Sequence, residues 1–314
     1  MSQAKNWKGV GTVLKMLIKR NAKLFFKDKG MFFTSLITPV ILLVLYATFL
    51  GNVYRDSFTM NLPETVKLSE KLLDGMVGGQ LISSLLAVSC VTVAFCSNFL
   101  MVQDKAIGTI KDLRISPVKA STLSLSYYIA ALLSTLLICL VATGLCLGYL
   151  AVTGWYLSLS DVLYLLLDVA LVVLFGTALS SVINLFLSSQ GQISAVGTIV
   201  SSGYGFICGA YMPISSFGQG LQKVISFLPG TYGTALTRNH AMQGALAEME
   251  TEGIPAQLIE ELKNALDCNL YFFEKQVSTP VMYGILVITI LVLIAVYILL
   301  NQLLNKKTSL YALR

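Results

Sequence analysis

The sequence predicts an all-α membrane protein with six transmembrane helices. Only 12% of the 314 residues are charged and 55% are hydrophobic, whereas soluble domains have roughly 25% charged residues. The hydrophobic residues also gather in windows without Asp, Glu, Lys or Arg. Each window reaches the roughly 20 residues that a membrane-spanning helix needs. The windows are 30–54, 75–103, 120–160, 169–222 and 276–305.

Six spans fit into these windows in chain order. The fourth charge-free window holds 54 residues, which is enough for most of one span, a polar turn and another span. The spans are predicted at 30–54, within 75–103, from about 120 to 153, from about 162 to 187, after a turn at 188–192, and within 276–305. Six spans place both termini on the same side of the membrane.

The distribution of Lys and Arg predicts which side that is. Fifteen of the 22 basic residues lie in the N-terminal segment, the loop at 103–120 and the C-terminal tail. The other seven are scattered through the longer loops on the opposite side. Cytoplasmic loops carry an excess of Lys and Arg. We therefore expect a multi-pass protein with both termini in the cytoplasm.

Residues 1–29 predict an interfacial amphipathic helix on the cytoplasmic side, preceding a transmembrane domain at 30–314. Its lysines recur every four residues, opposite a mostly apolar face: Lys15, Lys19, Lys23 and Lys27. A basic amphipathic helix before a span lies in the headgroup plane, so anionic lipid is an expected partner. The alternative is a soluble helix that binds a partner protein.

The charged loop at 103–119 predicts a short helix between the second and third spans. Its apolar residues recur at three-residue spacing, which places them on one helical face: Ile107, Ile110 and Leu113. Asp104 is a candidate cap. Pro117 prevents the helix from continuing, and Gly108 weakens its start by about 1 kcal/mol relative to Ala.

This loop resembles a motif of a known family. The run from Gly108 to Val118 reads Gly-Thr-Ile-Lys-Asp-Leu-Arg-Ile-Ser-Pro-Val. It is similar to the Gly-Thr-(Leu)-x-x-Leu-x-x-(Ser/Thr)-Pro-(Leu/Val) signature of ABC-2 type transporter permeases. In that family the loop is the coupling helix, which docks on a separate ATP-binding subunit. The resemblance implies coupling roles for Asp104, Ile107, Gly108, Thr109, Ile110, Leu113, Arg114 and Pro117.

Two residues of the loop depart from the family pattern. Asp104 stands where Glu is frequent, which keeps the charge, and Lys111 stands where Glu is usual, which reverses it. The alternative interpretation is an ordinary basic cytoplasmic loop.

The segment at 206–238 is too apolar for a free loop and too interrupted by Pro and Gly for one helix. We predict two short helical pieces that return into the membrane, where protein or a water-filled cavity must cover them. The spacings resemble the re-entrant element of ABC-2 permeases, which implies roles for Gly209, Pro213, Pro229, Tyr232 and Arg238. The alternative is a plain hydrophobic outer loop.

Asp168 lies two helical turns beyond Asp161, about 10 Å deeper in the fourth span. An ionisable group at that depth faces a polar path or pairs inside the bundle. Contact with a transported substrate and structural pairing, for example with Tyr or Ser, both remain open. The only histidine, His240, shows no ligand partner nearby in the sequence, and we expect no role for it.

Small residues recur every four positions in the fifth span: Gly197, Ser201, Gly205 and Gly209. Such a stripe permits close approach of helices. It predicts either the wall of a translocation path or a subunit interface, or else tight packing within one subunit. The following excursion at 239–279 is acidic, with a predicted helix from Pro255 to Ala265, and no task is assigned to it.

No Gly-x-x-x-x-Gly-Lys-Ser/Thr phosphate loop occurs in the sequence, so ATP hydrolysis is expected in another chain. The six cysteines show no spacing typical of a metal site or a disulfide framework. We expect no metal and no nucleic-acid partner.

The family resemblance implies an exporter of a drug, peptide or lipid-like substrate in a bacterial cytoplasmic membrane. It implies two ATPase subunits that bind ATP and Mg²⁺, and two permeases, either two copies of this chain or this chain with a paralogue. One alternative is export of a lipid-linked polysaccharide or teichoic acid. Another, from a different class, is a membrane sensor or scaffold that transports nothing.

Overall fold

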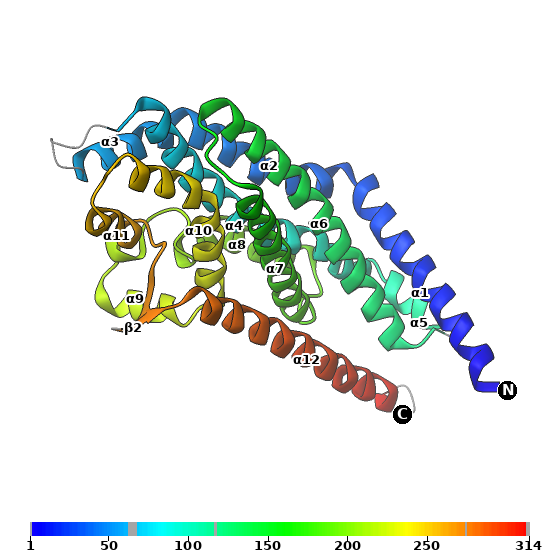
Figure 1. Ribbon diagram of the computed structural model, residues 1–314. Coiled ribbons are helices and arrows are strands. Elements are labelled where there is room, and N and C mark those ends of the chain that lie inside the picture. Colours follow the sequence, from blue (N-terminus) through cyan, green and yellow to red (C-terminus); the bar gives the residue numbers. More distant parts are fainter. Residues whose placement is uncertain (1, 62–67, 116–117, 274, 312–314) are drawn as a thin grey trace.

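The structure is a computed structural model that describes residues 2–61, 68–115, 118–273 and 275–311. These residues are almost entirely helical (Figure 1). The long helices are α1 (Ser2–Lys27), α2 (Lys29–Leu45), α4 (Glu70–Ala106), α6 (Ala120–Thr153), α7 (Leu159–Asn184), α8 (Gln190–Ile207), α10 (Pro229–Thr251) and α12 (Thr279–Tyr311).

Shorter elements join them. They are a π-helical turn (Tyr46–Leu50), α3 (Gly51–Asn61), α5 (Thr109–Ile115), a 3₁₀ turn (Ile214–Ser216), α9 (Gln219–Ser226), α11 (Ala256–Ala265), and the strands β1 (Leu270–Phe272) and β2 (Lys275–Val277). The two strands form an antiparallel hairpin in which Leu270 lies opposite Val277.

Helix α4 is the centre of the bundle. It is buried along almost its whole length and packs against α2, α6, α7, α8 and α10. A helix that is apolar on all sides is typical of a position surrounded by other helices. Small residues on the neighbouring helices allow them to approach α4 closely. At Gly176 of α7, an added Cβ would lie 3.0 Å from the Val91 Cα of α4.

The predicted fold class, an all-α membrane protein, is confirmed. Within the described residues, five helices are long and apolar enough to cross a membrane: Lys29–Asp56, Glu70–Ala106, Ala120–Thr153, Leu159–Asn184 and Thr279–Leu304. They correspond to the predicted spans one, two, three, four and six. The fifth predicted span, α8, has 18 residues and more polar side chains, so the total of six stays a prediction.

Several expected boundaries shift. The first span continues through Pro39 into the π-helical turn and α3. Helix α10 runs without a break through the predicted division between a re-entrant segment ending at 238 and an excursion starting at 239, and the division itself stays a prediction. Glycines inside α10 serve close packing rather than a break. An added Cβ at Gly244 would lie 1.9 Å from the backbone oxygen of Tyr156. The return of this segment into the membrane stays a prediction.

The N-terminal helix has the predicted two-faced character. Lys15, Lys19, Lys23 and Lys27 are exposed, while Asn21 and Phe25 are buried on the side that packs against α6. Asp28 separates α1 from α2, and its side chain caps α2 by accepting a hydrogen bond from the Met31 amide at 3.0 Å. The contact of the lysines with lipid stays a prediction.

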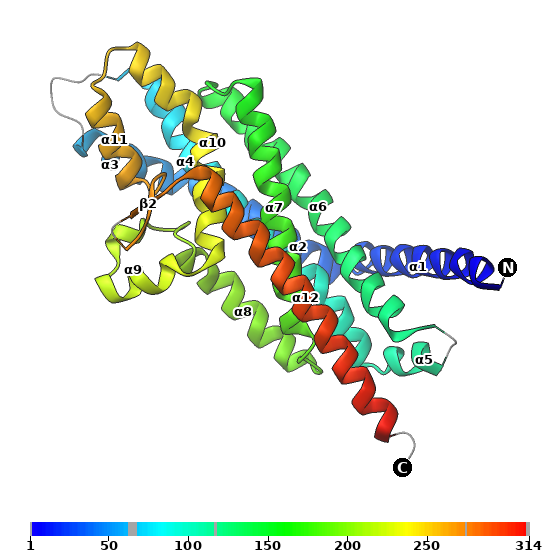
Figure 2. The same ribbon diagram turned by 60° about the horizontal axis from the view of Figure 1, so that its bottom comes forward.

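The start of α1 and the end of α12 lie toward the same end of the molecule (Figures 1 and 2). Figures 1 and 2 show the start of α1, the end of α12 and α5 at one end of the molecule. Helix α11 and the β-hairpin lie at the other end. This arrangement agrees with the expectation that both termini and the loop at 103–120 lie on the same side of the membrane. That this side is cytoplasmic stays a prediction.

The crossing of α4 and α7 generates a prediction about stability. Gly176→Val should destabilise the protein by about 1–3 kcal/mol, because the new side chain meets the backbone of Cys90 and Val91. The matched control is Gly148→Val in α6, where an added Cβ meets nothing within 4 Å. Thermal unfolding in detergent measures both variants. Equal melting temperatures for the two variants would contradict this view of the crossing.

Candidate functional site

The predicted coupling loop is fixed to the bundle at Asp104. This residue is 4% exposed and lies in the last turn of α4, so the prediction that it caps the loop helix was wrong. Its Oδ2 accepts hydrogen bonds from Arg20 Nη1 and from the Tyr127 hydroxyl, both at 2.5 Å. Asn21 donates to the Ser126 hydroxyl at 3.2 Å. The polar cluster therefore joins the ends of α1, α4 and α6.

Lys105, the next residue, binds a fourth helix. Its Nζ donates to the backbone oxygens of Asn184, Leu185 and Leu187 at 2.9, 2.9 and 3.2 Å. The last carbonyls of a helix lack partners within the helix and carry partial negative charge. The ammonium group therefore satisfies the end of α7, and the root of the loop is held by four helices.

The short helix α5 presents different residues from those predicted. Gly108 has a φ of +88°, a conformation that glycine adopts without strain, and this turn separates Ile107 from α5. Ile107 is 72% exposed, whereas Ile110 is 8% exposed and Leu113 packs against the core. The prediction that these three residues share one docking face was therefore wrong.

The apolar side chains that α5 leaves uncovered are Ile107 and Ile115, the latter 85% exposed. Lys111 and Asp112 are exposed between them, and Thr109 is half-buried. Pro117 and the side chain of Arg114 lie outside the described residues, so their coupling roles stay predictions.

A groove of about 620 Å³ runs between α2, α4 and α8. Its walls combine hydroxyl groups, glycines and apolar side chains, and include Thr34, Ile37, Thr92, Phe95, Phe99, Gly197, Thr198 and Ser201. Asp28 is the one charged side chain among the described lining residues. A mostly apolar cleft with a few polar groups suits an amphipathic ligand.

The stripe of small residues in and after α8 does not lie on one surface, and its role in a translocation path stays a prediction. Gly197 and Ser201 line the groove. Gly205 is buried, and an added Cβ there would lie 2.3 Å from the ring of Tyr211. Gly209 has a φ of +71° and ends the helix region with a turn. The first half of the stripe therefore faces the groove, while the second half packs within the chain.

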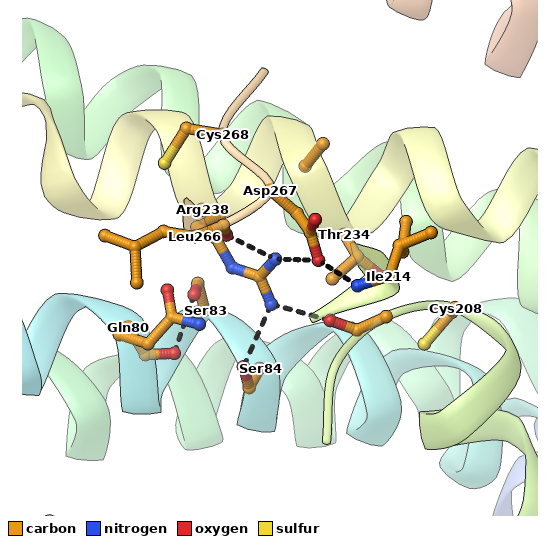
Figure 3. Close-up of polar contacts among 12 residues, drawn as sticks. Gln80, Ser83, Ser84, Cys208, Ile214, Thr234, Arg238, Leu266, Asp267 and Cys268 are labelled. Atoms are coloured by element: carbon orange, nitrogen blue, oxygen red, sulfur yellow. Dashed lines mark hydrogen bonds and ion pairs between the residues drawn. The ribbon is translucent and has the colours of Figure 1, made fainter. Parts of the chain in front are cut away.

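Arg238 of α10 is the centre of a buried polar cluster (Figure 3). Its Nη1 donates to the Leu266 backbone oxygen and its Nη2 to the Gly209 backbone oxygen, both at 2.8 Å. Nη2 also donates to the Ser84 hydroxyl at 3.3 Å. Nη1 lies 3.6 Å from Asp267 Oδ2. One side chain thus connects α4, the turn after α8 and the segment after α11.

Asp267 supports this cluster and was not predicted. Its Oδ2 also accepts a hydrogen bond from the Ile214 amide at 2.7 Å. Burial raises the pKa of Asp267, and the opposing effects of Arg238 and of the Ile214 amide are smaller. In the sequence, Asp267 is one acidic residue within an acidic segment. The sequence pattern does not distinguish it from its exposed neighbours.

The other residues of the predicted re-entrant element shape the chain locally. Pro213 precedes the 3₁₀ turn. Pro229 occupies the first turn of α10, where the missing amide hydrogen is tolerated. The Tyr232 hydroxyl donates to the Ser226 backbone oxygen at 2.6 Å, which ties α9 to α10.

Asp168 has two structural partners and does not line the groove. Its side chain is fully buried. The Tyr283 hydroxyl of α12 donates to Oδ1 at 2.5 Å, and His240 Nδ1 of α10 lies 2.6 Å from Oδ2. The ring of Tyr164 stacks on His240 with centroids 5.0 Å apart. His240, for which the sequence indicated no role, thus contacts a residue 72 positions away in sequence.

This cluster generates a prediction. Tyr283→Phe should destabilise the protein by about 1–3 kcal/mol, because it leaves a buried carboxylate oxygen without its donor. Tyr164→Phe is the control, since that side chain is 50% exposed and the change preserves the stacked ring. Thermal unfolding compares the two variants. If both retained the melting temperature of the parent protein, the cluster would have no stabilising role.

Comparison with known proteins identifies the family. The family model described as ABC-2 type transporter matches residues 12–240, which extend from α1 to the middle of α10 and cover more than two thirds of the chain. Comparison with curated proteins found no match. Members of this family are multi-pass permease components that work with ABC ATPase partners. The chain belongs to the ABC-2 type transporter family and is a membrane permease of an ABC transporter.

Proposed function

We propose that this permease is the membrane subunit of an ATP-driven exporter that moves an amphipathic drug, peptide or lipid-like substrate out of the cell. The observation that carries the proposal is the rigid attachment of the α5 loop through Asp104 and Lys105. A loop held by four helices transmits a displacement to the bundle, whereas a loosely attached loop would absorb it.

Docking of the ATPase rests on the exposed residues of the loop. Ile107 and Ile115 project from the bundle without apolar cover from the described part of the chain. They fit an apolar groove on a partner, and Lys111 fits an acidic rim. ATP and Mg²⁺ then bind in the partner ATPase, whose movement displaces α5. Two ATPases and two permeases complete the assembly.

The substrate class follows from the groove between α2, α4 and α8. Hydroxyl side chains from all three helices face it beside apolar ones, so an amphipathic molecule finds partners for both of its parts. Its open side is flanked by exposed residues of α8, including Thr198 and Ile199. A second permease placed against this side would close the groove into a path.

The proposal predicts which residues of the loop bind the ATPase. Ile107→Asp should abolish copurification of the ATPase, because an apolar contact of about 1.5–3 kcal/mol is replaced by a buried charge. Lys111→Ala should change the affinity by less than about fivefold, since an exposed charge contributes ~0–1 kcal/mol. Copurification and the substrate-stimulated ATPase rate are the measurements. Full assembly and coupling in Ile107→Asp would refute the docking assignment and favour a sensor or scaffold.

The root of the loop predicts a separate effect on coupling. Asp104→Asn preserves the shape of the side chain but removes the charge that pairs with Arg20, a loss of about 1–3 kcal/mol. The ATPase should still copurify, while its stimulation by substrate falls. Asp112→Asn, an exposed carboxylate on the same loop, serves as the control. Normal stimulation in Asp104→Asn would show that the loop transmits movement without this attachment.

A further inference from the structure

A second cleft, of about 870 Å³, lies at the end of the molecule opposite the termini. Its walls come from the 3₁₀ turn, α9, the start of α10, the segment after α11 and the β-hairpin. Figures 1 and 2 show α9 beside the hairpin, and α9 contacts β1. Its volume is in the range of pockets that hold drug-sized ligands, roughly 300–1,000 Å³.

Among the lining residues that the structure describes, the cleft carries an excess of positive charge. Lys223 of α9 and Lys275 of β2 line it and are exposed. Neither forms an ion pair with another described residue. The lining carboxylate of Asp267 is 8% exposed and lies beside Arg238. The two ammonium groups, with three donors each, are therefore available to an anionic ligand.

An apolar surface adjoins these charges. The rings of Phe227, Phe272 and Phe273 contact one another edge to face, with centroids 4.9–6.1 Å apart. Their exposed fractions are 62%, 37% and 56%. Lys223 Nζ lies 5.9 Å from the centroid of Phe273, which places a cation at the edge of this aromatic cluster.

Helix α9 extends the same surface. Leu221 and Val224 are 45% and 56% exposed on a helix whose apolar and polar residues lie on opposite faces. Amphipathic helices with Phe and Leu on their apolar face lie in the plane where a membrane meets water. A ligand with an apolar part can therefore approach along α9, while its polar part enters the cleft between the two lysines.

We propose that this cleft binds an amphiphile with an anionic headgroup. The headgroup contacts Lys223 and Lys275, and the apolar part lies against Phe227, Phe272 and Phe273. A phosphate ester is the simplest group of this kind. The proposal rests on charge and exposure at the cleft and is independent of which substrate the permease exports.

The test measures thermal unfolding of the purified full-length protein in a neutral detergent with three probes. They are short-chain phosphatidylglycerol, phosphatidylcholine with the same chains, and inorganic phosphate. Phosphatidylglycerol should raise the melting temperature in a saturable manner, because only it combines net negative charge with an apolar part. An equal rise with phosphatidylcholine would overturn the role of charge. An equal rise with inorganic phosphate would overturn the role of the apolar part.

Variants locate the effect. Lys223→Gln with Lys275→Gln should weaken binding of phosphatidylglycerol at least about tenfold, since hydrogen bonds to charged groups are strong. Both lysine side chains are exposed, so both substitutions should leave the protein folded. Binding of phosphatidylglycerol to the two single variants provides a second measurement. Lys71→Gln, an exposed lysine of α4 outside the cleft, is the control. Unchanged binding in the double variant, or equal loss in Lys71→Gln, would overturn the site.

Discussion

The fold depends on the burial of α4 along its length. A helix surrounded by others presents no face to water, so a buried polar side chain on it is accommodated best by a hydrogen-bond partner inside the bundle. Asn98 shows how this is achieved, because its Nδ2 donates to the Ser180 and Ser181 hydroxyls of α7 at 2.6 and 3.0 Å. The stretch between Asp74 and Asp104 contains no charged residue, which agrees with this burial. The surrounding helices pack along this stretch.

Each half of α4 contacts a cluster that contains charged side chains, one near the α5 loop and one around Arg238 of α10. Helix α4 therefore connects these two distant regions. Asp104 joins it to Arg20 at one end. Ser84, five turns or more away along the same helix, contacts Arg238. A continuous helix rises 1.5 Å per residue, so these two contacts are about 30 Å apart along one rigid element. In the proposed function, a displacement of the α5 loop therefore reaches the region beyond α10 by movement of α4 as a body.

Much of this architecture follows from the sequence, and the exceptions have physical reasons. Five of the spans were predictable because each long uncharged window overlaps a helix that is long and apolar enough to cross a membrane. The continuity of α10 was not, since a glycine that permits close packing, such as Gly244, resembles one that ends a helix. The loop was located correctly, but the turn at Gly108 places Ile107 and Ile110 in different surroundings, so that Ile107 is exposed and Ile110 is buried. The contact of Asp168 with His240 joins residues 72 positions apart, which no local pattern reveals.

Helix α10 is held on two faces by polar side chains. Arg238 and His240 are two residues apart, which places their side chains roughly 200° apart around the helix. Arg238 faces α4 and Asp267, while His240 faces Asp168 of α7. Separating the buried charge of Arg238 from its partners costs about 3–5 kcal/mol, and the contact of His240 with Asp168 would have to break as well. Any movement at this end of the permease is therefore expected to carry α10 along with α4 and α7 as one unit.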